Sequence, residues 1–124
     1  MKERRIEPVA ERDLGGHKMV VAMIAQVTDE DRVQAAVGVD HYYLGSASVC
    51  LPAHPVQWPP VLEQRIGLPV RLHLERYGAS HEEAAATWAE VRAWIVSRAH
   101  QALRDVPKFA KGFAAEVRAG RVAA

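Results

Sequence analysis

Hydrophobic residues in the first half of the chain follow the pattern of β-strands. Residues 18–27 form a β-branched and apolar run, five polar residues interrupt it at 28–32, and a second apolar run covers 33–39. Two such runs joined by a short polar segment predict a β-hairpin. Small and apolar residues at 46–51 predict a third strand, so the simplest arrangement of this part is a three-stranded meander.

The first sixteen residues carry many charges and few apolar side chains, and they end in Gly15-Gly16. This composition predicts a flexible N-terminal arm over residues 1–16, or at most an edge strand. We therefore expect a single domain over residues 17–124.

The segment that follows the third strand contains four prolines, at 52, 55, 59 and 60. Proline removes backbone donors, which excludes a helix or a central strand across residues 52–59. Pro60 suits the first position of a short helix that Gly67 would end. In residues 70–75, Val, Leu and Leu alternate with Arg, His and Glu, which predicts a fourth strand with one solvated face.

The last third of the chain is predicted to be helical. Ser80 and Glu83 have the spacing of a capping box, in which each side chain bonds to the other's backbone N–H. Apolar residues then recur every three or four positions until Pro107: Ala84, Trp88, Val91, Ile95, Ala99, Ala102 and Val106. This stripe predicts a long amphipathic helix. After Pro107, a second stripe of Phe109, Phe113 and Val117 predicts another helix that ends near Gly120.

Taken together, the element order is β-β-β-α-β-α-α. This order predicts an α+β fold in which an antiparallel sheet of about four strands packs against a long amphipathic C-terminal helix.

Composition narrows the class of protein further. The chain has 124 residues, 49% of them hydrophobic, and its only cysteine is Cys50. A single cysteine cannot form an internal disulfide, which favours a reducing compartment. The N-terminus lacks the apolar core of a signal peptide, and the longest apolar run, 19–25, is too short to cross a bilayer. We therefore expect a cytoplasmic protein without a membrane span.

Sequence motifs for catalysis are missing. The chain contains no GxGxxG, phosphate-binding P-loop, HExxH or GxSxG pattern, which argues against an enzyme and against a bound cofactor. Cys50 and His54 have a spacing that suits a soft metal ion. Structural zinc sites usually contain a Cys-x-x-Cys pair, which one cysteine cannot supply, so no metal site is predicted.

One alternative hypothesis is a small-molecule-binding protein or minor enzyme. Its pocket would be formed by a group of polar and aromatic residues, with Cys50 as a nucleophile beside a histidine base. The candidate residues are Asp40, His41, Tyr42, Tyr43, Cys50 and His73.

The leading hypothesis is a non-catalytic protein–protein interaction or oligomerisation domain. Trp94 lies to one side of the stripe that contains Trp88, so the long helix is apolar over more than half of its circumference. A partner helix, a second subunit, or the C-terminal helix folding back through Phe109 and Phe113 would cover this surplus. Trp58, among prolines, either contacts a partner or folds back against the end of the sheet. We expect a protein partner or a homo-oligomer.

A third hypothesis is based on the basic C-terminal end. Residues 98–124 contain six bases and two acids. Lys108, Lys111 and Arg118 lie opposite the apolar side of the predicted second helix. These cations suit a nucleic-acid accessory protein, although a solvated surface explains them equally simply.

Overall fold

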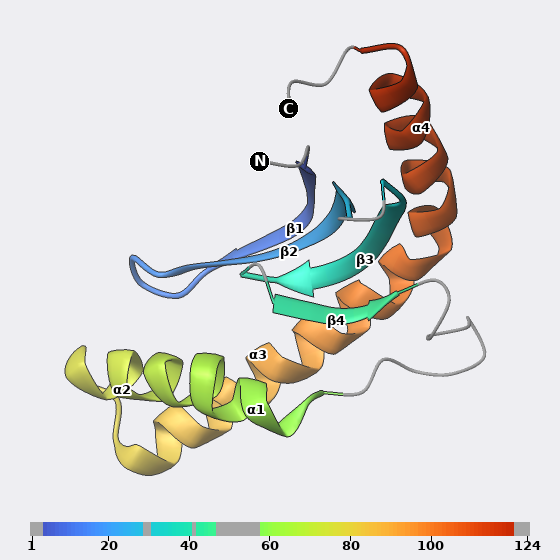
Figure 1. The fold of residues 1–124 in the computed structure, drawn as a ribbon. Coiled ribbons are helices and arrows are strands. Elements are labelled where there is room, and N and C mark those ends of the chain that lie inside the picture. The colour runs from blue at the N-terminus through green and yellow to red at the C-terminus, as the bar shows by residue number, and fades with distance from the viewer. Residues whose placement is uncertain (1–3, 29–30, 41, 47–57, 121–124) are drawn as a thin grey trace.

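The computed structural model describes residues 4–28, 31–40, 42–46 and 58–120. Its sheet has four antiparallel strands in the order β1-β2-β3-β4, and each strand pairs with its neighbour in sequence (Figure 1). The strands span Arg4–Asp13 (β1), Lys18–Val27 (β2), Val33–Val39 (β3) and Tyr42–Ser46 (β4). The predicted hairpin is confirmed, because β2 and β3 pair from Val27 with Val33 to Val21 with Val39.

Of the two alternatives for residues 1–16, a loose arm or an edge strand, the structure shows an edge strand, β1. This strand pairs with β2 along its whole length, from Arg4 opposite Gln26 to Asp13 opposite Lys18. Its charged side chains, apart from the half-buried Arg12, are exposed, as is common for an edge strand, where they discourage pairing with another chain. Pro8 is tolerated at an edge, and the register shifts between Pro8 and Ala10.

The third predicted strand begins earlier than expected. β4 starts at Tyr42 and ends at Ser46, whereas the prediction covered 46–51. Residues 47–51 lie outside the part of the chain that the structure describes.

The fourth predicted strand is a helix. α1 (Pro60–Leu62) continues through a π-helical turn, η1 (Glu63–Gly67), into α2 (Leu68–Arg76), so Gly67 does not end the helix. The buried residues Leu62, Ile66 and Val70 recur every fourth position, which is a helical period. Alternation over only six residues, 70–75, fits a strand as well as a helix, which is why the prediction was wrong.

The π-helical turn explains how the helix passes Pro69. Proline has no backbone N–H and its ring clashes with the carbonyl four residues earlier. In η1 the chain adopts a wider turn, in which the N–H of Leu68 donates to the carbonyl of Glu63, five residues before it. Such turns absorb a local irregularity without breaking the helix.

The C-terminal helical region agrees with the prediction. α3 spans His81–Ala102, a short 3₁₀ turn η2 covers Leu103–Asp105, and α4 spans Val106–Arg118. The capping box is confirmed: the Glu83 N–H donates to Ser80 Oγ at 3.1 Å, and the Ser80 N–H donates to Glu83 Oε1 at 3.1 Å. Pro107 lies in the first turn of α4, where its missing N–H costs nothing.

The helices pack on one face of the sheet, so the α+β class with a long C-terminal helix is confirmed (Figure 1). The main core joins the sheet to α1, α2 and α3. Its buried residues include Met19, Val21, Met23, Val37, Val39, Leu62, Ile66, Val70, Trp88, Val91 and Ile95. A second cluster of Ala25, Val27 and Phe113 fixes α4 against β2. Within the described residues, no helix combines the length and apolar character needed to cross a bilayer.

Candidate interaction surfaces

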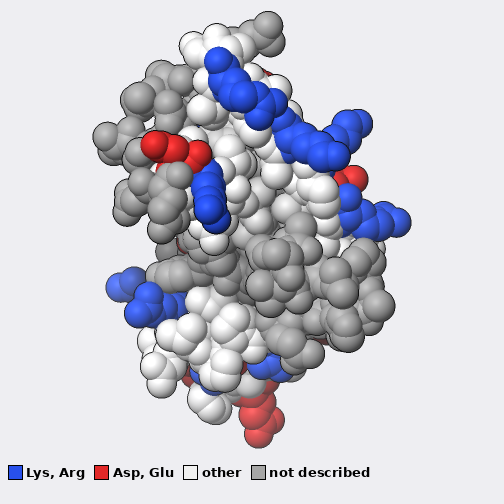
Figure 2. Space-filling model, turned by 45° about the vertical axis from the view of Figure 1, so that its right-hand side comes forward, with Lys and Arg blue, Asp and Glu red and all other residues white. Residues whose placement is uncertain are grey.

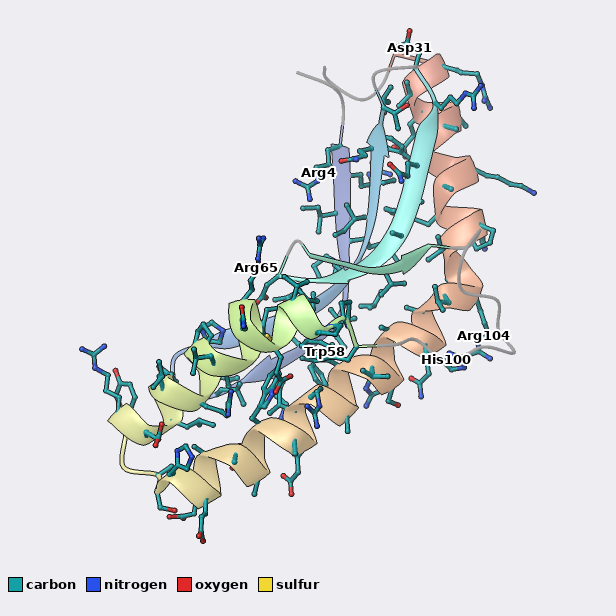
Figure 3. All side chains as sticks on the ribbon, turned by 60° about the horizontal axis from the view of Figure 1, so that its bottom comes forward. Arg4, Asp31, Trp58, Arg65, His100 and Arg104 are labelled. Carbon is teal, nitrogen blue, oxygen red and sulfur yellow. The ribbon has the colours of Figure 1, made fainter. Side chains whose placement is uncertain are left out.

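A half-buried contact network fixes the helix formed by α1, η1 and α2 against α3. The indole N–H of Trp88 donates to Glu63 Oε1 at 2.7 Å, and that of Trp58 donates to Glu63 Oε2 at 2.9 Å. Arg92 adds an ion pair from Nη1 to Oε2 at 3.3 Å. Figure 3 shows Trp58 between α1 and α3, where its ring meets Trp88 edge-on at a centroid distance of 5.6 Å. The Glu63 carboxylate therefore joins three separate parts of the chain.

The pKa of Glu63 is consistent with a carboxylate that accepts these hydrogen bonds in its charged form. Burial acts to raise the pKa of Glu63, but the hydrogen bond from Trp88 and the charge of Arg92 outweigh it, and the pKa lies below its ordinary value of 4.5. The carboxylate is thus charged at neutral pH, as two indole donors and a guanidinium require.

A second contact fixes α2 to the turn between β1 and β2. His73 Nε2 lies 3.0 Å from the carbonyl oxygen of Leu14 and 3.2 Å from that of Gly15. Carbonyl oxygens only accept hydrogen bonds, so Nε2 carries the proton in this arrangement. The imidazole also packs against His17 and Tyr77, at centroid distances of 5.9 and 4.8 Å.

With its inner side fixed in this way, the same helix carries apolar residues on its outer side. Val61 is 51% exposed, Leu68 45%, Leu72 56%, and Tyr77, in the turn after α2, 74%. Only Ile6 and Val9 of β1 are comparably exposed large hydrophobic residues in the described part of the chain. We call Val61, Leu68, Leu72 and Tyr77 the outer apolar face.

A hollow of about 630 Å³ lies beside the outer apolar face and opens to solvent. Pro69, Leu72, His73, Glu75 and Arg76 line it, all of them from α2. Glu75 is already engaged by His81, whose Nδ1 lies 3.2 Å from Glu75 Oε1. The hollow is therefore mainly an apolar and cationic recess along one helix, a shape that suits packing of another helix more than enclosure of a small molecule.

The residues predicted to bind a partner are largely occupied within the chain. Trp88 and Phe113 are core residues, 2% and 1% exposed. Trp94 and Phe109 are half-buried against the main core, and the guanidinium of Arg12 lies 5.8 Å from the centre of the Trp94 ring. The sheet, α1 and α2 therefore cover the main stripe of the long helix, whereas Trp94 and Phe109 remain partly exposed, and binding of a partner through this side stays a prediction.

The residues of the small-molecule hypothesis are brought together only in part. Asp40 is half-buried, with its Oδ2 3.9 Å from Nε2 of His17, and His17 in turn contacts His73. Sequence reasoning missed His17, because nothing in its local pattern marks it. Tyr42 and Tyr43 lie on β4, while His41, Cys50 and His54 are outside the described residues. Among the residues that are described, no three His, Cys, Asp or Glu side chains are placed to hold a metal ion.

The cations of the nucleic-acid hypothesis lie at the surface. Lys108, Lys111 and Arg118 are exposed on α4, and Arg104 of η2 is exposed beside them. Figure 2 shows several Lys and Arg side chains at the surface, with acidic groups beside some of them.

Comparison with known proteins finds no match of this chain to a protein-family model, a curated protein or a solved structure.

Proposed function

We propose that the chain is a cytoplasmic protein-interaction domain that associates with a second copy of itself through the outer apolar face. The hydrophobic pattern of the sequence also favours a protein-interaction domain. The binding surface proposed now lies on α1 and α2, whereas the sequence pattern indicated α3. One observation carries the proposal: three large hydrophobic side chains lie exposed along one helix whose inner side is already packed, and Tyr77 lies exposed in the turn after it. Contiguous exposed apolar residues on a small domain are typical of interaction sites.

The spacing of these residues suits a second copy. Leu68 and Leu72 lie one turn apart in the middle, Val61 lies seven residues before them, and Tyr77 lies five residues after. If two copies pack antiparallel about a twofold axis near residue 70, Leu68 of one copy faces Leu72 of the other. Val61 then lies toward the end of the second copy that carries Tyr77. A surface that is complementary to itself in this way is what a twofold dimer requires.

Charges at the two ends of the outer apolar face do not oppose this pairing. In the antiparallel arrangement, Arg76 of one copy approaches Gln64 of the other rather than another cation. Glu75 is neutralised locally by His81 when that histidine is protonated. The ends of the face therefore add no pair of like charges. Arg71, which is half-buried and one residue from the axis, lies near Arg71 of the second copy, and this repulsion weakens the association.

The size of the outer apolar face determines how strongly we expect two copies to associate. A helix over residues 60–76 is about 25 Å long, and one helix face lies at the small end of protein interfaces. We expect a weak dimer whose population depends on protein concentration.

Isotope-filtered NMR on a mixture of labelled and unlabelled protein tests the arrangement directly. We expect intermolecular contacts between Leu68 and Leu72 methyl groups at high concentration, and their loss in Leu72→Asp. Contacts that instead join Leu68 to Leu68 and Val61 to Val61 would contradict the antiparallel geometry. Absence of intermolecular contacts at the highest soluble concentration would overturn self-association.

A further inference from the structure

We propose that a basic row along α4 binds the phosphate backbone of nucleic acids, independently of self-association. The basic row consists of Arg104, Lys108, Lys111 and Arg118, all exposed. These residues follow η2 and α4 along the chain, and Figure 2 shows Lys and Arg side chains at the surface of the molecule.

The four cations share one side of the helix. At about 100° per residue, their spacing of four, three and seven residues places them within about a quarter of the circumference. Ala115, which is small and exposed, is the residue that continues this side between Lys111 and Arg118. At about 1.5 Å per residue the row extends over about 21 Å, which spans several phosphates of a nucleic-acid strand.

Acidic groups lie near both ends of the row, but in the described part of the chain they form no ion pair with its cations. α4 contains one acid, Glu116, which lies to the side of the row and pairs with Arg5 of β1 at 2.6 Å. Asp105 is about a third of a turn from Arg104 in the 3₁₀ helix η2, and both line one hollow. Asp31 lines another hollow together with Arg118. Within the described residues, none of the four cations forms an ion pair, so they are available to an external anion.

The opposite side of α4 is fixed to the sheet. Val106 and Phe113 are each 1% exposed, and Phe113 packs on Ala25 and Val27. An amphipathic helix binds a lipid surface by inserting its apolar side, and here that side is already used in the core. The cations are thus presented on a helix held in place, which favours the backbone of a nucleic acid over an anionic membrane.

The side chains of α4 limit how far it could recognise a particular base sequence. Its sequence, Val106–Arg118, has no Asn, Gln, Ser or Thr that could hydrogen-bond to base edges. Lysine and arginine on phosphates position a protein on nucleic acid without selecting a sequence. We therefore expect sequence-independent binding dominated by counterion release.

Fluorescence anisotropy with labelled 20-base-pair DNA and RNA duplexes, in a salt series, tests this inference. Four phosphate contacts predict that log Kobs falls against log salt concentration with a slope of about −3 to −4. Lys111→Gln removes one contact and should lower affinity about eightfold near 0.1 M salt, and Lys108→Gln with Lys111→Gln should reduce the steepness of the slope by about 2.

The matched control is Lys18→Gln, which removes the same charge from the start of β2 next to the β1–β2 turn, far from α4. It should leave the slope and the affinity nearly unchanged, and circular dichroism should show all variants folded. Binding that weakens equally in Lys18→Gln and Lys111→Gln would overturn the assignment to α4. So would a lack of salt-dependent duplex binding, or binding to vesicles of anionic phospholipid in place of both duplexes.

Discussion

Trp88 donates its indole N–H to Glu63 across 2.7 Å, and the same ring lies against the backbone of Gly67. One tryptophan of α3 thus holds both ends of the π-helical turn η1. Because this turn connects α1 to α2, the contact decides which side of the helix faces the core. Leu62, Ile66 and Val70 are directed inward, and the outer apolar face remains exposed.

Glu63 should make folding stability depend on pH. Its pKa is lowered in the folded protein, since the donors from Trp88 and Arg92 outweigh the opposing effect of burial. The folded state therefore binds this proton less readily than the unfolded chain, and Glu63 stabilises the fold above its ordinary pKa of 4.5. This contribution is lost as the pH falls through the lower folded pKa.

Urea midpoints of the wild type and Glu63→Gln, measured from about pH 7 to about pH 3, test this linkage. We expect the wild type to be more stable near neutrality and its advantage to shrink in acid. An advantage that stays constant over this range would contradict the role given to the carboxylate.

Gly67→Ala should destabilise the protein, although alanine is ordinarily the better helix former. A Cβ at residue 67 would lie 2.8 Å from Nε1 of Trp88, so the indole or the helix must shift. Overpacking of this kind costs about 1–3 kcal/mol. Gly112→Ala in α4 is the matched control: its Cβ meets nothing within 4 Å, and it should stabilise by roughly 0.5–1 kcal/mol. Thermal or urea unfolding that shifts both variants in the same direction would refute the close approach.

Ser80→Ala should lower the free energy of unfolding by about 1 kcal/mol, because it removes the acceptor for the Glu83 N–H at the start of α3. Ser97→Ala, on the exposed side of the same helix, controls for the loss of a hydroxyl and should change stability little. Equal urea midpoints for Ser80→Ala and the wild type would show that the cap contributes nothing.

Long periodic segments were predictable from the sequence. The stripe through Trp88 and Ile95 covers six turns, so its period identifies α3, and the Ser80 cap marks where it begins. The hairpin of β2 and β3 follows from two apolar runs on either side of a polar break. In both cases the local pattern and the tertiary packing agree.

Segments that are short, or in which the local signals conflict with the tertiary packing, were not predictable from the sequence. β1 has the charged composition of an edge strand, and its pairing depends on β2 rather than on its own pattern. For α2, Gly67 and Pro69 are ordinary breakers, and only the contact of Gly67 with Trp88 and the wider turn at Pro69 explain why the helix continues. The recurrence of Leu62, Ile66 and Val70 at every fourth residue was the signal that could have identified it.

The same reasons apply to the candidate surfaces. The apolar excess of α3 was visible, but what covers it depends on where α1 and α2 pack, so Trp88 was assigned to a partner and belongs to the core. Leu68 and Leu72 were hidden by the assignment of 70–75 to a strand. Three residues of the basic row, Lys108, Lys111 and Arg118, were identified from the sequence. Arg104 lies four residues before Lys108, and this helical spacing would have identified it as the fourth.

Sedimentation of the wild type, Leu72→Asp and Ala93→Asp across about 10 µM to about 1 mM tests self-association most directly. Ala93 is exposed on α3, so Ala93→Asp adds the same charge away from the outer apolar face. We predict that the average mass of the wild type and Ala93→Asp rises from 13.7 kDa towards twice that value, while Leu72→Asp stays monomeric with an unchanged urea midpoint. A wild type that remains monomeric throughout, or a Leu72→Asp variant that associates equally well, would contradict the proposed dimer.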